Sequence, residues 1–355
     1  MSGKKIKIVL IYAGIGGKGF NSVGQGMDSG WISHGLASLS AAIKSQGFKV
    51  ELIDLRTLRG WKHFRDEIDL RKPDIVGVTM MSSDYTYAMR SLEIARQVNP
   101  HIITAAGGPH PTLMIDEVRD DSKINHIFLG EGEITFPLFL KKIARGEKVE
   151  RIIPSIPPTL DELPYIDHDF FLHEWRRAGY SLNSPEVPFC PQLKPPFVTI
   201  IAGRGCIYNC SFCQPAERIL FGRGVRRRSV DNIIGELKEL REKYHFKSFM
   251  FHDDCLTEDQ EWVKAFCDSY KANGFTQSFF CQSRADLVVK NEDMIRRMAH
   301  VGLCGLFIGF ESGSERVLRF LEQEIGLQDL RTHIDVLEIF TPQDFQCKNN
   351  AHLGS

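Results

Sequence analysis

The sequence predicts an α/β protein with an N-terminal doubly wound parallel sheet and a C-terminal partial (β/α) barrel. Short apolar runs alternate with helical patterns through residues 1–145, and the alternation resumes at residue 197. Short strands that alternate with helices indicate parallel sheets covered on both faces. Between the two halves, nine of the sixteen prolines lie within residues 154–196. This proline density is typical of an extended linker.

The composition excludes several classes of protein. The chain has 355 residues, is 43% hydrophobic and carries a formal net charge of −1, which favours a globular fold and gives no sign of a nucleic-acid or anionic-membrane partner. No apolar run approaches the ~20 residues of a membrane-spanning helix, and the N-terminus lacks the pattern of a signal peptide. Nine cysteines, an odd number, favour a reducing compartment over a disulfide framework. We therefore expect a cytoplasmic location.

Residues 1–145 are predicted to form a flavodoxin-like or Rossmann-like domain. The strand-like runs are 5–13, 48–55, 73–81, 101–108 and 124–130. Glycine-rich or polar residues follow most of these runs, and doubly wound sheets bind ligands at the carboxyl ends of their strands. The glycines of 14–19 match a dinucleotide-binding fingerprint only loosely, so nicotinamide or flavin binding is not favoured.

Residues 197–321 are predicted to form a barrel domain after a linker at 146–196 that contains one short helix. Four strand-like runs, at 196–203, 246–254, 277–286 and 305–313, each lead into a loop and a helical pattern. A capping box formed by Thr257 and Gln260 is expected to begin the second helix. No fifth or sixth strand is evident, and residues 322–355 are predicted to be a helical or disordered tail. The barrel is thus expected to be truncated after its fourth strand, with an open edge that favours self-association.

Three cysteines lie in one loop directly after the first barrel strand: Cys206, Cys210 and Cys213. Thiolates are soft ligands that suit zinc, copper(I) or iron–sulfur clusters. A structural zinc site needs four ligands, and Cys190 or Cys255 would have to supply the fourth. A cubane iron–sulfur cluster held by three cysteines instead keeps one iron open for a substrate or cofactor. The position at the mouth of a barrel favours the cluster.

The loop GCIYNCSFC resembles the signature of the radical S-adenosylmethionine (SAM) enzymes. FHDDCLTED, CQSRAD and GFESGSERVL, at the ends of the next three strands, are similar to the barrel of the cobalamin-dependent members. GGPHPT, GEGE and LDELPYIDHD resemble the B12-binding domain of the same family. The resemblance implies a [4Fe–4S] cluster on Cys206, Cys210 and Cys213 that reductively cleaves SAM to a 5′-deoxyadenosyl radical. It also implies methyl transfer through cobalamin to an unactivated carbon or phosphorus centre.

The resemblance implies that SAM is bound at the strand ends around the cluster. Phe212 would pack near the adenine, and Arg284 would hold the carboxylate group through two hydrogen bonds. Carboxylates and polar acceptors would hold the ammonium group and the ribose. The implied SAM contacts are Phe212, Asp253, Asp254, Ser283, Arg284, Glu311 and Ser312. The simpler alternatives are that the two aspartates cap a helix and that Arg284 forms a structural ion pair.

The same resemblance implies a cobalamin site at the strand ends of the first domain. Its implied residues are Ser82, Ser83, Gly107, Gly108, His110, Glu131 and Glu133. The two glycines would let the corrin or its tail approach the backbone closely. The motif D-x-H-x2-G, which marks a histidine ligand to cobalt in this family, is absent after the first strand. His110 is therefore expected to line the pocket or cap a loop rather than to bind cobalt.

Other polar and sulfur-containing residues have simpler interpretations. The arginine run within 223–228 is expected to form a solvated face, with contact to an anionic substrate or to the cobalamin phosphate as the alternative. Cys267, Cys281 and Cys304 are expected to pack in the core.

Three functions stay open on the sequence. The leading one is a cobalamin-dependent radical SAM methyltransferase with a small-molecule substrate, an electron donor of the flavodoxin or ferredoxin type and no nucleic-acid partner. A second enzyme keeps both cofactors but forms a ring or rearranges its substrate without methylation. The third is an inactive protein that binds cobalamin or a cluster, which the short barrel suggests. The residues do not identify the substrate.

Overall fold

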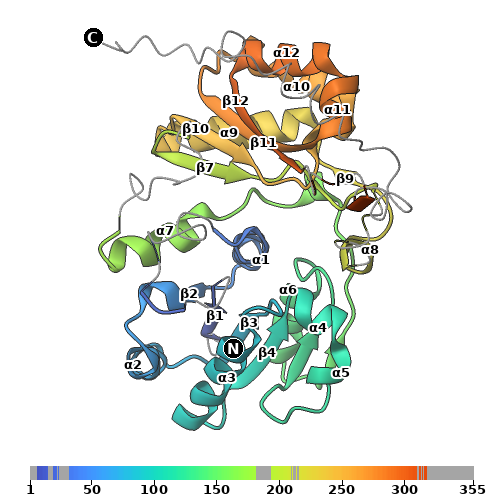
Figure 1. Ribbon diagram of the computed structural model, residues 1–355. Helices are drawn as coiled ribbons and strands as arrows, with labels where there is room; N and C mark the ends of the chain where they lie inside the picture. Colours follow the sequence, from blue (N-terminus) through green and yellow to red (C-terminus); the bar gives the residue numbers. More distant parts are fainter. Residues whose placement is uncertain are drawn as a thin grey trace. The chain divides into compact units, whose positions relative to one another are not determined.

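The computed structural model describes residues 6–14, 19–21, 23, 32–180, 193–208, 210, 213, 216–309, 312, 314, 316 and 317. The chain divides into two compact units, Met1–Phe189 with Ile219–Gly222 and Cys190–Arg218 with Arg223–Ser355. Each unit is built on its own parallel sheet (Figure 1). Among the described residues, no helix is both long and apolar enough to cross a membrane.

The first unit contains a six-stranded parallel sheet with the order β2-β1-β3-β4-β5-β6. Its strands are β1 (Ile8–Tyr12), β2 (Val50–Asp54), β3 (Ile75–Thr79), β4 (Ile103–Gly107), β5 (His126–Phe128) and β6 (Ile152–Ile153). Ile8 of β1 lies opposite Val50 on one side and Ile75 on the other. The predicted doubly wound fold is confirmed. Since the strand order reverses at β1, the loops after β1 and β3 border the expected ligand-binding edge.

Helices cover both faces of this sheet. They are α1 (His34–Ser45), α2 (Trp61–Arg71), α3 (Tyr85–Val98), α4 (Pro109–Leu113), α5 (Ile115–Val118) and α6 (Thr135–Ala144). Helices α2 and α3 contact each other, whereas α1 contacts α6. Side chains alternate between the faces of a strand, so every second residue of β1 faces the same helices. Val9 accordingly belongs to a buried apolar cluster with Phe64 of α2 and Leu92 of α3.

Part of the proline-rich segment is built into the first unit. Strand β6 pairs with β5 at the edge of the sheet. Helix α7 (His168–Arg177), which corresponds to the short helix expected in the linker, contacts β2 and α1. Its apolar face is buried, and Phe171 and Trp175 are at most 4% exposed. Burial of these two rings stabilises the helix against the sheet.

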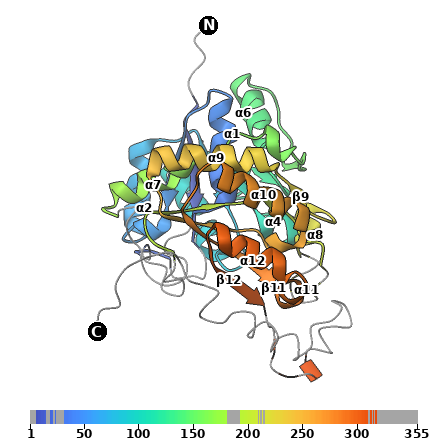
Figure 2. The ribbon, with the colours of Figure 1, turned by 90° about the horizontal axis from the view of Figure 1, so that it is seen from above.

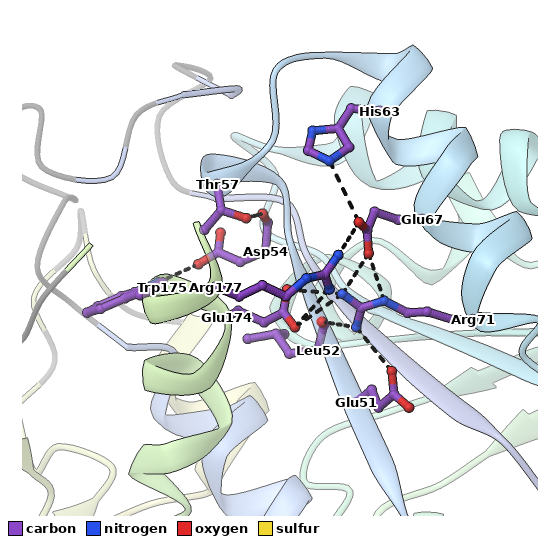
Figure 3. A network of polar contacts seen from close by, with 10 residues as sticks. All are labelled: Glu51, Leu52, Asp54, Thr57, His63, Glu67, Arg71, Glu174, Trp175 and Arg177. Atoms are coloured by element: carbon purple, nitrogen blue, oxygen red, sulfur yellow. Dashed lines mark hydrogen bonds and ion pairs between the residues drawn. The ribbon is translucent and has the colours of Figure 1, made fainter. Parts of the chain in front are cut away.

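Charged side chains of α7 also enter a buried ion-pair network (Figure 3). Arg71 of α2 lies 2.9 Å from Glu67 of the same helix and 3.1 Å from Glu174 of α7. Arg177 of α7 also pairs with Glu67. Removal of one member from a buried network leaves the others without a counter-charge, so these pairs fix the position of the helix.

The second unit contains a four-stranded parallel sheet with the order β12-β11-β10-β7. Its strands are β7 (Phe197–Ile200), β10 (Ser248–Phe251), β11 (Ser278–Arg284) and β12 (Leu303–Gly309). Neighbours in this sheet are consecutive among these four strands, as in the beginning of a (β/α) barrel. A short antiparallel ribbon joins β8 (Gly203–Arg204) to β9 (Arg226–Arg227). The predicted tail at 322–355 lies outside the described residues.

The helices of the second unit follow its strands in chain order. They are α9 (Val230–Tyr244), α10 (Gln260–Ala272), α11 (Ala285–Lys290) and α12 (Glu292–Val301). Helix α8 (Ala216–Phe221) is divided between the units, since Ile219–Gly222 is assigned to the first. Helix α10 lies between α9 and α12 and contacts both (Figure 2). The predicted capping box is wrong. Asp259 caps α10 by accepting a hydrogen bond from the Trp262 amide at 3.0 Å, while Thr257 belongs to the preceding turn η3 (Leu256–Glu258).

Aromatic rings form the core of the second unit. Phe249 of β10 stacks on Phe279 of β11 with the ring centroids 5.4 Å apart, and Phe266 and Tyr270 of α10 pack against Phe279. The three cysteines expected in the core, Cys267, Cys281 and Cys304, are at most 5% exposed. That prediction is confirmed, and these thiols contribute apolar contacts to the core.

Two of the four arginines in the run, Arg227 and Arg228, depart from the expectation of a solvated face, whereas Arg223 is exposed. Arg227 pairs with Glu258 at 2.8 Å and lies over the ring of Trp262. Arg228 donates to the carbonyl oxygen of Ile201 at 3.1 Å and pairs with Glu236. A buried cation needs such partners. The contacts of the two guanidinium groups therefore fix the positions of the ribbon and of the start of α9.

Candidate functional site

The glycine pair that ends β4 brings two strand-end loops of the first unit together. Gly108 has a φ of +98°, and a Cβ atom there would lie 2.7 Å from Thr79 Oγ1. Only glycine tolerates both this backbone conformation and this close approach. The Met80 amide donates to Gly107 at 2.8 Å, and the His110 amide donates to Met80 at 2.9 Å. The loops after β3 and β4 thus form one continuous edge.

His110 holds this edge together from inside. Its side chain is 4% exposed, and Nδ1 lies 3.0 Å from the hydroxyl oxygen of Ser82. The ring lies 4.6 Å from that of Tyr85, and Nε2 lies 3.6 Å from the carboxylate of Glu117. Ser82 and Ser83 are exposed on the loop. Of the residues assigned to cobalamin, the structure therefore brings Ser82 into contact with His110.

The loop after β5 supplies the remaining predicted residues. Glu131 and Glu133 are 8% and 6% exposed. The backbone amide of Glu131 donates to Ser155 Oγ at 3.0 Å, and the hydroxyl of Thr112 accepts from the Gly130 amide at 2.8 Å. These bonds attach the β5 loop to the residues that follow β4. The carboxyl ends of β3, β4 and β5 therefore present all seven residues proposed for cobalamin.

Asp253 occupies the carboxyl end of β10 in the second unit. It is 5% exposed, and its Oδ2 accepts a hydrogen bond from the Ala202 amide at 2.8 Å. Arg227 lies 3.6 Å from its other oxygen. Burial raises the pKa of Asp253 to about 6, even though these neighbours and the Gly203 amide lower it. Asp253 thus connects the end of β10 to the segment that follows β7.

Asp254 lies beside Glu217 of α8, a residue that no sequence pattern singles out. Asp254 is more exposed than Asp253, and its carboxyl group is hydrogen-bonded to that of Glu217. Burial, followed by the negative charge of Asp254, raises the pKa of Glu217 to about 7. Two carboxyl groups in this arrangement can share one proton, because protonation of one removes the repulsion between two negative charges. Without that proton, the pair would attract a cationic group.

Ser283 and Arg284 end β11 and point to different partners. The hydroxyl of Ser283 lies 2.6 Å from that of Thr257, and both side chains are buried. The guanidinium of Arg284 forms an ion pair with Asp286 through Nε at 2.9 Å. It also lies 3.9 Å above the ring centroid of Tyr208, in the cysteine loop. The structural ion pair considered for Arg284 is thus present, together with a contact to the loop.

The three cysteines of the loop are free thiols with different exposures. Cys206 and Cys210 are half-buried, whereas Cys213 is exposed. The Cys213 amide donates to the Cys210 carbonyl oxygen at 3.1 Å, which forms a turn. Burial raises the pKa of Cys206 to about 11, although a hydrogen bond from the Tyr208 amide opposes this shift. Nη1 of Arg284 lies 3.8 Å from the sulfur of Cys210.

The donor set of this loop fits an iron–sulfur cluster chemically. Three thiols within one loop supply the soft ligands that such a cluster requires. A backbone amide and a guanidinium group, both hydrogen-bond donors, already point at two of the sulfurs. No three histidine, cysteine, aspartate or glutamate side chains in the described part of the chain converge to hold a metal ion. The assignment of the three ligands therefore rests on their spacing and chemistry.

Two of the predicted SAM contacts, Phe212 and Glu311, lie outside the described residues. Ser312 is described, and its hydroxyl accepts from the Ser314 amide at 3.1 Å. Three side chains at this edge were not among the predicted site residues: Tyr208, Glu217 and Thr257. Tyr208 lies inside the cysteine motif, so its position was a usable signal. Glu217 and Thr257 reach the edge only through contacts between distant segments.

Comparison with protein families identifies the two units. Residues 27–140 match the model of the B12 binding domain, and residues 200–352 match that of the radical SAM superfamily. The chain belongs to the cobalamin-binding radical SAM family. The radical SAM match extends to residue 352 and includes most of the segment for which a tail was predicted. Cobalamin, SAM and a [4Fe–4S] cluster are the cofactors of these two domain types.

Curated relatives of this family include methyltransferases and a cyclase. The chain is 28% identical over 273 residues to an uncharacterised methyltransferase of Pyrococcus horikoshii, covering 72% of this chain and 55% of the relative. It is 25% identical over 340 residues to a cytidylyl-2-hydroxyethylphosphonate methyltransferase of Streptomyces wedmorensis, with coverages of 81% and 62%. It is also 25% identical over 338 residues to an anaerobic magnesium-protoporphyrin IX monomethyl ester cyclase of Rubrivivax gelatinosus, with coverages of 90% and 59%. The chain thus spans less than two thirds of each relative.

A solved structure supports the fold of this family member. The cobalamin-dependent SAM radical enzyme OxsB, with aqua-cobalamin and SAM bound, superposes with a TM-score of 0.70 at 18% identity. The match covers 94% of this chain and 47% of OxsB. At this level of identity the likeness establishes the arrangement of strands and helices and leaves the substrate undetermined.

Proposed function

We propose that this chain carries out cobalamin-dependent radical SAM chemistry and transfers a methyl group to an unactivated carbon or phosphorus centre of a small molecule. The observation that carries the proposal is the presence of both domain types in one chain, with three cysteines directly after the first strand of the radical SAM sheet. When bound, the cluster and SAM supply a 5′-deoxyadenosyl radical and cobalamin supplies the methyl group.

Different residues of the second unit would bind the cluster and the separate groups of SAM. Cys206, Cys210 and Cys213 would hold the cluster. The pair of Asp254 and Glu217 would accept the ammonium group of SAM, since their shared proton can be replaced by a cation. Nη2 of Arg284, which has no hydrogen-bond partner among the described residues, remains for the carboxylate of SAM. Phe212, Ser283, Glu311 and Ser312 would complete the contacts to adenine and ribose.

The first unit would hold cobalamin at the carboxyl ends of β3, β4 and β5. Gly107 and Gly108 let neighbouring segments approach this edge closely, since a Cβ atom at Gly108 would meet Thr79 and one at Gly107 would meet Phe128. Ser82 and Ser83 offer exposed hydroxyl groups beside them. His110 would stabilise the loop through Ser82, and Glu131 and Glu133 would line the edge. Nδ1 of His110 is engaged with Ser82, whereas Nε2 lies 3.6 Å from Glu117 and has no hydrogen-bond partner among the described residues. The proposal that His110 stabilises the loop and does not bind cobalt therefore rests on the Nδ1 contact and on the missing D-x-H-x2-G motif.

Methyl transfer is favoured over ring formation by the relatives that are named methyltransferases, and the cyclase supports the second candidate function. Either reaction would need an external one-electron donor of the flavodoxin or ferredoxin type. The seven cysteines that the structure describes are all free thiols, which supports a reducing, cytoplasmic location.

Anaerobic reconstitution with iron, sulfide and hydroxocobalamin tests the proposal. We expect about four irons and about one cobalt per chain after desalting, followed by formation of 5′-deoxyadenosine from SAM under reducing conditions. A product heavier by one methylene group supports methyl transfer, and a product without this gain supports the cyclase-like reaction. A chain that binds iron but no cobalt would contradict the proposed function.

A further inference from the structure

We propose that Arg284 controls the reduction potential of the iron–sulfur cluster by donating an N–H hydrogen bond to the thiolate of Cys210. This inference rests on the proposed function, because it assumes that Cys210 is a cluster ligand. It assigns Arg284 a role different from the two-bond hold on the SAM carboxylate that the sequence predicts.

The guanidinium of Arg284 is held from three directions. Nη1 lies 3.8 Å from Cys210 Sγ, within hydrogen-bonding range for sulfur. Nε pairs with Asp286 at 2.9 Å, two residues further along the chain. The face of the group lies 3.9 Å from the ring centroid of Tyr208. The side chain is only 12% exposed, so bulk water screens these contacts weakly.

These contacts determine which N–H points at the sulfur. A guanidinium is planar and its five donors have fixed directions, so the bond from Nε to Asp286 and the stacking on Tyr208 fix the orientation of Nη1. With Nε and Nη1 engaged, Nη2 is left without a partner among the described residues. A two-bond hold on the SAM carboxylate would require Arg284 to release Asp286 or Cys210. The hydrogen bond from Nη1 of Arg284 to the sulfur of Cys210 is thus formed by the protein's own residues.

The effect on the cluster follows from charge. One-electron reduction adds a negative charge to the cluster and its thiolates, and a fixed cation with an N–H donor on one sulfur stabilises the reduced form. Hydrogen bonds to the sulfurs are among the factors that set the potential of iron–sulfur clusters. Asp286 partly offsets the positive charge, but it is 29% exposed and therefore better solvated than Arg284. The net effect of Arg284 is to make reduction easier.

A redox titration of the reconstituted chain, followed by electron paramagnetic resonance, tests this role. We expect Arg284→Met to lower the equilibrium constant for cluster reduction at least tenfold, which corresponds to a fall of about 59 mV in a one-electron potential. Arg284→Lys should retain part of the effect, since it keeps the charge and loses the planar contact. Arg297→Met, which removes an exposed arginine paired with Asp268, serves as the matched control and should not shift the potential.

Two variants of Tyr208 test the geometry separately. Tyr208→Phe keeps the ring face and should leave the potential unchanged, whereas Tyr208→Leu removes it and should shift the potential in the same direction as Arg284→Met. If Arg284→Met fails to retain iron, the comparison of Arg284→Lys and Tyr208→Leu with the original chain decides the matter.

The outcomes separate this inference from the proposed function. Full iron content with an unchanged potential in Arg284→Met, or in both Arg284→Lys and Tyr208→Leu, would overturn the role of Arg284 and leave the proposed function standing. Absence of iron from the reconstituted original chain would overturn both proposals. A lowered potential in Arg284→Met but not in Arg297→Met would support the hydrogen bond to Cys210.

Discussion

Arg56 is among the largest fully buried side chains of the first unit, and its charge is neutralised locally. It donates to Asp54 through Nε at 3.0 Å and Nη2 at 2.8 Å. Its guanidinium also lies 4.5 Å from the ring centroid of Tyr12 and 5.5 Å from that of Trp175. Trp175 donates its indole N–H to the same Asp54 at 2.9 Å. Asp54 therefore supplies a buried counter-charge to Arg56.

Asp54→Ala should destabilise the chain by about 3–5 kcal/mol, because it removes the carboxylate that pairs with a buried guanidinium through Nε and Nη2. The free energy of unfolding of the first unit, measured in urea by circular dichroism, checks this expectation. Glu93→Ala breaks the exposed pair with Arg90 and serves as control, with an expected cost below about 1 kcal/mol. Equal effects of the two substitutions would contradict the importance assigned to the buried pair.

Glu217 gives the second unit a pH-dependent stability. Its pKa is raised to about 7 in the folded chain by burial and by Asp254, so the folded state holds a proton that the unfolded state loses at lower pH. The free energy of unfolding should therefore fall as pH rises from about 4.5 to about 7.

Glu217→Gln should remove this part of the pH dependence, since the amide does not titrate. The melting temperatures of the original chain and of the variant are measured across that pH range. The melting temperature of the variant, relative to that of the original chain, should rise toward the upper end of the range. A difference between the two chains that stays constant with pH would contradict the raised pKa of Glu217.

At the scale of single elements, α7 shows how a segment with linker-like composition becomes part of a domain. Its buried face carries Phe171 and Trp175, and its exposed face carries His173 and Arg176. Glu174, on the buried side, has its pKa raised by burial, although Arg71 and Arg177 lower it. The helix is thus held by both apolar contacts and ion pairs, in contrast to a flexible tether.

Trp175→Ala should weaken the attachment of the whole helix by about 3–5 kcal/mol, because it removes a large buried ring and the hydrogen bond to Asp54. Hydrogen exchange of the α7 backbone amides reports this directly and should become markedly faster. Arg176→Ala, on the exposed face of the same helix, should leave the exchange rates unchanged. Similar rates in the two variants would mean that α7 is not held by its buried face.

At the scale of the whole molecule, the two cofactor sites are proposed in different compact units. The residues proposed for cobalamin lie in the first unit, and the cysteines and SAM contacts lie in the second. Each set follows the carboxyl ends of the strands of its own parallel sheet. The two sites should therefore be separable by mutation.

Gly108→Ala should abolish cobalt binding and leave iron binding intact, because the new Cβ would clash with Thr79 and strain the backbone. Simultaneous replacement of Cys206, Cys210 and Cys213 by alanine should have the opposite effect. Gly146→Ala is the matched control, since Gly146 shares a positive φ of +71° but has open space around it. Metal analysis after reconstitution gives the result, and loss of both metals in either variant would contradict separate sites.

Local pattern predicts much of this architecture, and it fails at identifiable residues. The strands and most helices were predictable because buried parallel strands are short apolar runs. The sequence predicted Thr257 as the cap of α10, whereas the structure shows Asp259 in that role. Both residue types are common at caps, and the hydroxyl of Thr257 contacts Ser283 instead. Arg227 and Arg228 were wrongly expected to be solvated because their acidic partners lie further along the chain, at Glu258 and Glu236.

The sequence by itself determined the fold class and the three thiols of one loop, because each depends on periodicity or spacing within a short segment. The two domain families were inferred from the resemblance of short motifs to known enzymes. Only the tertiary structure decided that α7 belongs to the first unit, that Glu217 lies beside Asp254 and that Arg284 points at Cys210. Those contacts join residues that are distant in the chain. Their free energy arises from burial and charge pairing, which no local pattern records.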